Sequence, residues 1–494
     1  MAALFAAAPD TSESDLRPKT IILSLLILAL MPAAAAASAR QVALFQDDPL
    51  LVHQGGAIRA QTLDELQTLG VDAIKVQLNW SSVAPTGRRK PAGFDGSDPA
   101  AYPGFAPFDG FVADAQAQGF RVMIALSPPV PGWATARKGD REGEDRPSAK
   151  EFARFVEAAG RRYPTVDLWT LWNEPNHPGY LYPQATSKRV LYSPRLYRGL
   201  MRATTAGLRR SGHSGDRVLF GELLPIGKSK IFRRNTVKPV LWLRELFCLD
   251  SRWRPYRGRT ARLHGCNGYR KLTGFNGFAY HPYTRAQGPR AVEPSRDDAT
   301  IRSIGRITRA LDIARRKRRI GGPRMSVWNT EFDFQSNPPD RFGARLARIP
   351  GFMGESEWMA YRNPRVASHS QYTLLDAPLG PGGDTSTWQG GLRFASGKVK
   401  KGVYAAYRLP LFVRLLGPNA VEVWGAARPG GAGAIVQVQE RRGRSPYRSL
   451  GGPITVKSAQ GYFKARFRLM RASRRDFRFT SGEHASWAVK AANR

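Results

Sequence analysis

Short apolar segments alternate with longer amphipathic segments along most of the chain beyond residue 40. Nearly continuous apolar residues over a short run are typical of strands that are buried on both faces, as in a parallel sheet. Eight such segments are found, at residues 42–46, 71–80, 120–128, 166–174, 217–225, 275–283, 324–332 and 366–375. Repeated strand–helix units predict an α/β fold, a (β/α)8 TIM barrel over residues 40–417. A doubly wound open sheet is the alternative, but no glycine-rich phosphate turn follows the first segment.

The segments between these strands show helix signals. Thr62 followed by Glu65, and Ser148 followed by Glu151, predict capping boxes at the starts of two helices. Residues 404–416 are predicted as the last helix, with an interruption at Pro410 because proline cannot continue a helix.

The pattern changes after Gly417. Val436 and Val438 alternate with glutamines, and residues 463–469 alternate between apolar and basic side chains. This period of two indicates half-buried antiparallel strands. We therefore expect residues 418–494 to form a small β-sandwich-like domain packed on the barrel.

Residues 1–39 have the features of an N-terminal extension and signal peptide. Arg17 and Lys19 precede the apolar run 21–31, and Ala37-Ser38-Ala39 fits a cleavage site before Arg40. We expect a secreted or cell-envelope protein. The alternative is an uncleaved signal anchor, which would hold the chain at a membrane.

The chain carries a net charge of +37, which raises the question of a polyanionic partner. The basic residues are scattered, and no helix-turn-helix, zinc-finger or RNA-recognition motif accompanies them, so no specific nucleic-acid partner is expected. A solvated basic surface and an anionic partner, such as an acidic glycan, both stay open.

The two cysteines, Cys248 and Cys266, lie in one loop-like region between the fifth and sixth predicted strands. In an exported chain they predict a disulfide, with two free thiols as the alternative. If this loop walls off one end of a cleft, it decides between endo and exo action.

Two predicted strands end in a glutamate, Glu174 on strand four and Glu331 on strand seven. The carboxyl ends of barrel strands form the active site, and strands four and seven lie nearly opposite each other. Cleavage of a glycosidic bond needs one protonated and one ionised carboxyl group. The alternative is a pair of rim carboxylates bound to the many arginines.

The motifs around these glutamates are WNEPN (172–176), YHPY (280–283), NTEF (329–332) and WQGGL (388–392). With them, residues 41–417 resemble the clan of retaining glycoside hydrolases whose acid/base ends strand four and whose nucleophile ends strand seven. Families 39 and 5, the cellulase-like group, are the most similar. The resemblance implies that Glu174 is the general acid/base and Glu331 the nucleophile. The reaction would be a retaining double displacement on an oligo- or polysaccharide.

The resemblance also implies residues that contact the sugar or the nucleophile. Asn173 would bind the sugar 2-hydroxyl, Tyr283 would donate to Glu331, and His281 would lie in the sugar-binding wall. Trp388 would be a stacking platform, with Trp133 as a weaker candidate; core packing is the alternative for both.

One departure from the clan is Lys75, which stands where members commonly carry an arginine on strand two. Lysine supplies charge without the bidentate fork. A catalytically inactive glycan-binding envelope protein on the same barrel is therefore the alternative function, and an envelope protein held to anionic polymers by charge alone is a third. No metal or other cofactor is expected, because no metal-ligand spacing, phosphate loop or dinucleotide motif is found, and we expect a monomer.

Overall fold

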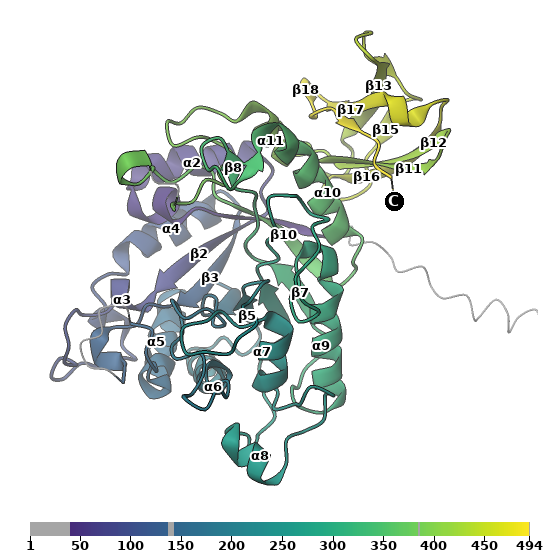
Figure 1. Ribbon diagram of the computed structural model, residues 1–494. Helices are drawn as coiled ribbons and strands as arrows, with labels where there is room; N and C mark the ends of the chain where they lie inside the picture. The colour runs from purple at the N-terminus through teal and green to yellow at the C-terminus, as the bar shows by residue number, and fades with distance from the viewer. Residues whose placement is uncertain (1–39, 137–142, 384–385, 494) are drawn as a thin grey trace, which may run out of the picture.

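The computed structural model describes residues 40–136, 143–383 and 386–493, so the predicted signal peptide lies outside the described residues. Eight parallel strands close into a barrel, which confirms the predicted fold class (Figure 1). Around the barrel the order is β1-β10-β7-β6-β5-β4-β3-β2. The strands are β1 (Val42–Gln46), β2 (Ala73–Asn79), β3 (Arg121–Ser127), β4 (Leu168–Leu171), β5 (Arg217–Leu223), β6 (Gly277–Tyr280), β7 (Ser326–Asn329) and β10 (Val366–Tyr372).

Helices surround the barrel. The longer ones are α2 (Gly56–Thr68), α4 (Ala106–Ala117), α5 (Ala149–Arg162), α6 (Ser193–Arg210), α7 (Pro239–Leu246), α9 (Gly305–Arg316), α10 (Ile349–Tyr361) and α11 (Lys401–Arg408); α3 (Trp80–Val83) and α8 (Gly258–Leu263) are short. Only the Ser148 half of the capping box predicted for α5 is confirmed: Ser148 accepts from the amide of Glu151 at 3.4 Å, but the Ser148 amide donates to the Ala134 carbonyl and not to Glu151. The cap predicted at Thr62 is wrong: α2 already begins at Gly56, and the Thr62 hydroxyl donates to the Ile58 carbonyl. Among the described residues, no helix has the length and hydropathy to span a membrane.

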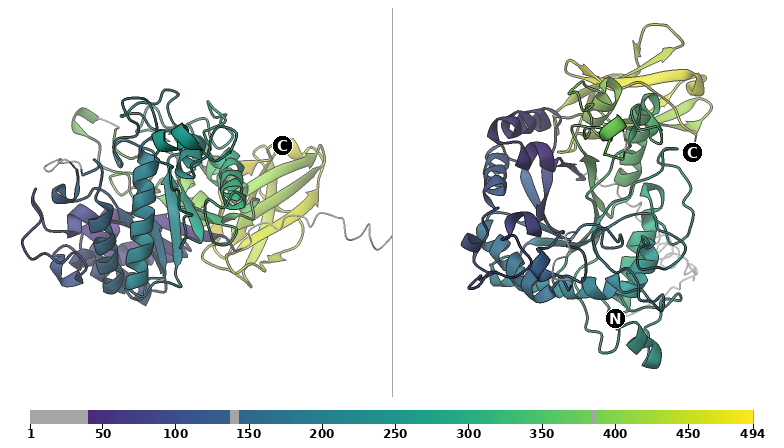
Figure 2. Two further views of the ribbon diagram at one scale, coloured as in Figure 1. Left: turned by 90° about the horizontal axis from the view of Figure 1, so that it is seen from below. Right: turned by 60° about the vertical axis from the view of Figure 1, so that its left-hand side comes forward.

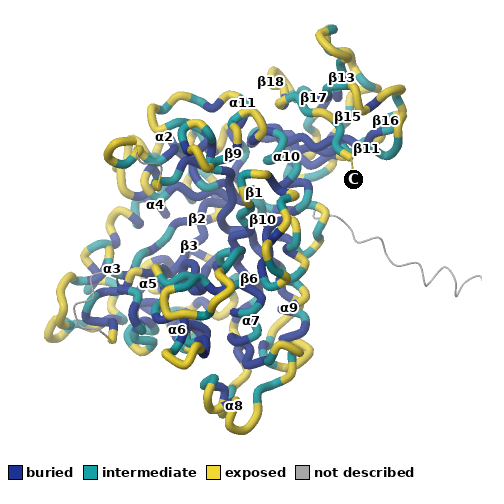
Figure 3. Tube along the Cα trace, in the orientation of Figure 1, coloured by how far each residue is buried: buried dark blue, intermediate teal, exposed yellow. Residues whose placement is uncertain are grey.

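The barrel interior is apolar where the strands begin and polar above that layer. One apolar cluster takes side chains from all eight strands: Val42, Leu44, Ala73, Met123, Leu168, Leu219, Ala279, Trp328 and Ala367. Side chains two positions further along a strand point to the same side. On β2 and β4, the residues two positions after Ala73 and Leu168 are Lys75 and Thr170, both completely buried. Figure 3 shows this buried centre in dark blue.

The C-terminal part consists of antiparallel sheets, as predicted, and lies beside the barrel (Figure 2). One sheet has the order β11-β12-β16, and another joins β14-β13-β17-β18. The strands are β11 (Leu411–Gly417), β12 (Ala420–Ala426), β13 (Ile435–Arg442), β14 (Arg448–Ser449), β15 (Ile454–Thr455), β16 (Tyr462–Arg468), β17 (Arg475–Ser481), β18 (His484–Ala485) and β19 (Val489–Lys490). Val423 of the first sheet and Val438 and Phe479 of the second belong to one core, as in a sandwich.

The helix predicted over 404–416 is wrong in its second half. The helix α11 ends at Arg408, and residues 411–417 form β11, which pairs with β12 in antiparallel register. The residue before a proline is disfavoured in helical conformation, so Pro410 ends the helix rather than kinking it. The strand β11 thus lies before residue 418 but pairs in the C-terminal sheet.

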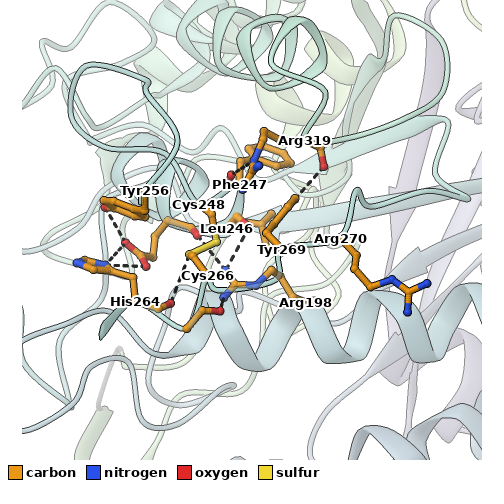
Figure 4. Close-up of a disulfide and its surroundings, with 12 residues drawn as sticks. Arg198, Leu246, Phe247, Cys248, Tyr256, His264, Cys266, Tyr269, Arg270 and Arg319 are labelled. Atoms are coloured by element: carbon orange, nitrogen blue, oxygen red, sulfur yellow. Dashed lines mark hydrogen bonds and ion pairs between the residues drawn. A yellow bond between two sulfur atoms is a disulfide. The ribbon is translucent and has the colours of Figure 1, made fainter. Parts of the chain in front are cut away.

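Cys248 and Cys266 form a disulfide, which confirms the predicted pairing (Figure 4). The bridge follows α7. Tyr269, close after Cys266 in the chain, donates to the carbonyl of Arg319 at 2.8 Å, and Arg319 lies between α9 and the start of β7. A helix that returns antiparallel to the barrel strands ends where the next strand begins. The bridge therefore lies at the face opposite the strand ends that carry Glu174 and Glu331. The bridge itself therefore does not wall off the mouth where these strand ends lie.

Removal of this disulfide is expected to lower stability without changing activity. The bridge closes a loop of 18 residues in sequence separation, and the chain-entropy model assigns such a loop about 3 kcal/mol. A Cys248→Ser/Cys266→Ser variant should unfold at lower urea concentration than the oxidised wild type and match the reduced wild type. If the folded variant also lost the activity proposed below for the opposite face of the barrel, the placement of the bridge would be contradicted.

Candidate active site

The segment after β4 is held in an uncommon backbone conformation. Trp172 has φ 71° and Glu174 has φ 39°, the left-handed region that non-glycine residues rarely adopt. The side chain of Asn176 fixes this segment, because its amide donates to the carbonyls of Leu224 at 3.0 Å and Val237 at 2.8 Å. Such backbone strain is typical of functional sites and directs the Glu174 side chain over the barrel mouth.

Glu174 and Glu331 meet at this mouth. One carboxylate oxygen of each lies within 4.8 Å of the other, and the two residues are 8% and 6% exposed. Both line a cavity of about 450 Å³ whose walls come from β2, from the end of β10 and from the residues after β4, β5, β6, β7 and β10. The structure therefore brings together the two glutamates that the sequence predicted from separate strands.

Four side chains face the carboxylate of Glu331. Oε1 accepts from Lys75 Nζ at 3.1 Å and from Gln77 Nε2 at 3.2 Å. Oε2 accepts from the Tyr283 hydroxyl at 3.3 Å and lies 3.4 Å from Nδ1 of His281. These contacts fix the orientation of the Glu331 carboxylate.

Glu174 has fewer partners and a different electrostatic environment. Its Oε1 lies 3.0 Å from His281 Nδ1. Burial raises the pKa of Glu174, and the nearby charge of Glu331 adds to this rise against the opposing hydrogen bond from His281. Glu174 is therefore suited to hold a proton, whereas Glu331 is surrounded by donors.

A third glutamate, Glu222, lies beneath the pair and was missed by the sequence analysis. It is fully buried and accepts from Thr170 at 2.7 Å, from Thr330 at 2.8 Å and from Lys75 at 3.0 Å. It also makes a very short contact with Nε2 of His281. Although burial alone would raise the pKa of Glu222, the charges of Lys75 and His281 lower it to about 2.

A bulge in β5 turns Glu222 toward the barrel interior. The register between β5 and β6 shifts between Gly221 and Leu223, and Gly221 has φ 126°. A side chain at Gly221 would lie 2.3 Å from the carbonyl oxygen of Ala279, so only glycine fits. The signal available in the sequence was a glycine followed by a charged residue inside an otherwise apolar strand.

Lys75 occupies the centre of the polar layer. It is completely buried and binds two carboxylates, Glu222 and Glu331. Burial alone would lower the pKa of Lys75, but the attraction of these carboxylates outweighs burial and raises this pKa above its ordinary value. Lys75 is thus a permanent cation next to the predicted nucleophile.

The predicted sugar-contacting residues fall into two groups. Asn173, Tyr283 and Trp388 line the cavity, and the Trp388 indole donates to Asp333 in its wall. His281 does not line the cavity but lies under the glutamates, fully buried. Trp133 is also outside this cavity; it is 8% exposed and donates to the Pro85 carbonyl at 3.1 Å.

Glu174, His281 and Glu331 each offer one atom within the spacing that a metal ion needs. Burial alone would lower the pKa of His281. The charge of Glu331 and the hydrogen bonds to Glu174 and Glu222 outweigh burial and raise this pKa to about 9. Below that pH both ring nitrogens carry protons, so the ring offers no lone pair to a metal. The donor set suits proton transfer better than metal binding.

Neither models of protein families nor curated protein sequences match this chain. Several solved structures have a similar fold. A family 5, subfamily 18 glycoside hydrolase from Streptomyces cattleya shares 14% identity over 76% of this chain and 80% of its own, with a TM-score of 0.47. A family 51 α-L-arabinofuranosidase from Bifidobacterium longum shares 12% identity over 88% of this chain and 96% of its own, with a TM-score of 0.43. A β-glycosidase from Pyrococcus horikoshii shares 12% identity over 76% of this chain and 95% of its own, with a TM-score of 0.44. The chain thus has a distant structural similarity to barrel glycoside hydrolases of several families, and none of them is assigned to it.

Proposed function

We propose that this chain is a glycoside hydrolase that cleaves O-glycosidic bonds of an oligo- or polysaccharide with retention of configuration. The observation that carries the proposal is the approach of the Glu174 and Glu331 carboxylate oxygens to within 4.8 Å at one cavity. Carboxyl groups about 5–5.5 Å apart suit a covalent double displacement, whereas inversion needs roughly 6.5–9.5 Å to admit a water.

In the first step, Glu331 attacks the anomeric carbon, and the bond to the leaving oxygen breaks as Glu174 gives that oxygen its proton. The sugar is then an ester of Glu331, and Glu174 is ionised. In the second step, Glu174 takes a proton from water, whose oxygen attacks the anomeric carbon and releases Glu331. The proton-holding environment of Glu174 and the four groups around Glu331 support this division of roles.

Two residues of the cavity wall support a sugar as the ligand. The Oδ1 atom of Asn173 is buried without a hydrogen-bond partner, so it can accept from a sugar hydroxyl. Trp388 is partly exposed in the wall, where its apolar ring can stack on a sugar face.

The direct test is a screen of the purified 40–494 chain against aryl glycosides, neutral polysaccharides of glucan, mannan and xylan type, and anionic polysaccharides such as polygalacturonate. The proposal expects release of reducing sugar from at least one of them. Binding to a glycan without any turnover, unchanged in Glu174→Gln and Glu331→Gln variants, would instead support the inactive glycan-binding alternative.

We further propose that the glycan carries negative charge and is held at a second cavity of about 880 Å³ on the outside of the barrel. The net charge of +37 favours such a partner. Of the residues that the structure describes, no acidic one lines this cavity, whereas four arginines from separate segments do: Arg290, Arg302, Arg362 and Arg414. Nε of Arg414 is buried without a hydrogen-bond partner, and Arg362 lies over the Trp358 ring at 4.7 Å. Carboxylates behind three of the arginines fix their positions: Glu293, Glu355 and Glu422.

An Arg302→Ala/Arg362→Ala variant is expected to bind a short oligogalacturonate at least about tenfold more weakly than wild type, because charge-assisted hydrogen bonds are lost. An Arg315→Ala/Arg316→Ala variant removes the same charge from exposed positions of α9 and should stay within about twofold. Titration calorimetry measures both, with a neutral cello-oligosaccharide as the uncharged ligand. Equal weakening by both variants would assign the binding to overall charge rather than to this cavity.

A further inference from the structure

Five ionisable groups beneath and at the cavity form one contact network. Lys75 contacts Glu222 and Glu331, while His281 contacts Glu222, Glu174 and Glu331. Lys75, Glu222 and His281 are completely buried, and none of the three lines the cavity. Glu222 therefore cannot touch a substrate, and any effect it has on the reaction must pass through its neighbours.

His281 meets a charged or polar group on every side. Glu222 faces its Nε2, while Glu174 at 3.0 Å and Glu331 at 3.4 Å share its Nδ1. The other groups near it are Lys75 on β2, Thr170 on β4, Thr330 after β7 and Tyr283 on its own segment. Asp48, after β1, bonds to the amide of Gln77 and the side chain of Gln46 and does not contact the ring. Within the described part of the chain, carboxylates alone accept from the two ring nitrogens.

We propose that Glu222 is a positioning residue that keeps His281 in its doubly protonated form, so that the Nδ1 proton can serve Glu331 and Glu174 in turn during the reaction. This inference rests on the proposed function and adds a residue to it. A neutral imidazole has one donor nitrogen, whereas the imidazolium donates at both. With Glu222 accepting at Nε2, the Nδ1 donor stays available to the two glutamates above.

The charge of the contact network supports this role. Before the reaction, Lys75 and His281 are positive, Glu222 and Glu331 negative and Glu174 protonated, so the network is neutral. After the first step, Glu331 is an uncharged ester and Glu174 has given up its proton, so the network is neutral again. The negative charge has moved from one neighbour of His281 Nδ1 to the other. A buried network that needs no compensating charge avoids a large desolvation cost at each stage.

The first measurement is the titration of His281 by NMR of the protein labelled with 15N-histidine. The chain has seven histidines, and the His281 signals are identified by their loss in His281→Asn. Wild-type His281 should keep both ring protons through neutral pH and titrate near its pKa of about 9. In Glu222→Gln, which preserves shape and removes charge, the titration should move down by about 1–3 pH units. Thr170→Val removes the hydrogen bond that Thr170 donates to Glu222 but keeps the charge of Glu222. This variant should leave the titration of His281 near the wild-type value.

The second measurement is the pH profile of kcat. In Glu222→Gln, kcat should approach the wild-type value near pH 5 and fall to about a tenth of it near pH 8, as the imidazolium loses its proton. KM should not change, because Glu222 does not reach the cavity. A purely structural role for Glu222 would lower kcat equally at all pH values.

The outcomes separate this inference from the proposed function. If His281 in Glu222→Gln stays doubly protonated to pH 8, or loses its proton without any effect on the kcat profile, the inference is overturned. If the variant does not fold, a wild-type His281 that titrates at or below its ordinary value near 6.5 overturns it equally. If wild type hydrolyses no glycan while His281 titrates as expected, the proposed function fails and the buried charge arrangement remains.

Discussion

Replacing Glu331 with glutamine is expected to lower kcat by about 10⁴-fold or more, because an amide does not form the ester with the anomeric carbon. The amide keeps the size of the side chain. Its oxygen can still accept from Lys75 and Gln77, which lie 3.1 and 3.2 Å from Oε1. Substrate affinity should therefore change much less than kcat, and direct binding measurements on the variant would show this.

Glu174→Gln is the companion variant, with a loss of about 10²–10⁴-fold that depends on the leaving group. Aryl glycosides with acidic phenols need little protonation and should lose least. Glu245→Gln is a matched control, since Glu245 is buried, accepts from Tyr256, contacts His264, and lines neither of the two cavities. If Glu331→Gln retained more than a hundredth of wild-type kcat, Glu331 could not be the nucleophile.

The second large effect is expected from Lys75→Met, which should lower the free energy of unfolding by about 3–5 kcal/mol. The substitution leaves Glu222 buried with His281 as its remaining cation and takes one donor from Glu331. Activity should fall with stability, because the orientation of Glu331 depends on this donor. Urea unfolding followed by tryptophan fluorescence, together with kcat of the folded variant, measures both effects.

The pH dependence of stability has a defined sign for two groups. The pKa of Glu222 falls from 4.5 to about 2 on folding, so its contribution is present above pH 4.5 and is lost as the pH falls through 2. The pKa of His281 rises from 6.5 to about 9, so its contribution is complete below pH 6.5 and is lost as the pH rises through 9. The difference between wild type and Lys75→Met should therefore shrink toward pH 2.

Lys400→Met provides the comparison for this variant. Lys400 is another buried lysine, bound to Asp376 at 2.7 Å, and it does not contact Glu174 or Glu331. Both variants should lose stability, but only Lys75→Met should lose kcat by more than about tenfold in the folded state. Similar activity in the two variants would contradict the placement of Lys75 beside the nucleophile.

The barrel was predictable because its strands are buried on both faces, which makes them continuous apolar segments such as residues 120–128 and 217–225. The meeting of Glu174 and Glu331 was predictable because each glutamate lies at the end of such a segment. The β11 strand was not, since a short apolar run after Tyr404 fits a helix and a strand equally until its partner β12 is known.

The groups beneath the pair could not be recognised in the same way. Glu222 faces the interior only because of the bulge at Gly221, and a bulge reverses the inside–outside alternation of a strand. His281 follows a regular strand, but its neighbours come from β2, β4, β5 and β7, which are far apart in the chain. A single sequence shows which residue types are present, whereas their contacts depend on the register of the closed barrel.

The most direct test of the central claim is to trap the covalent intermediate with a 2-deoxy-2-fluoro glycoside that bears an activated leaving group. The account predicts that the chain gains the mass of one fluorosugar and that peptide mapping places it on Glu331. It also predicts that proton NMR shows the substrate's anomeric configuration in the first product. Inverted product, or a label on Glu174 or Glu222, would contradict it.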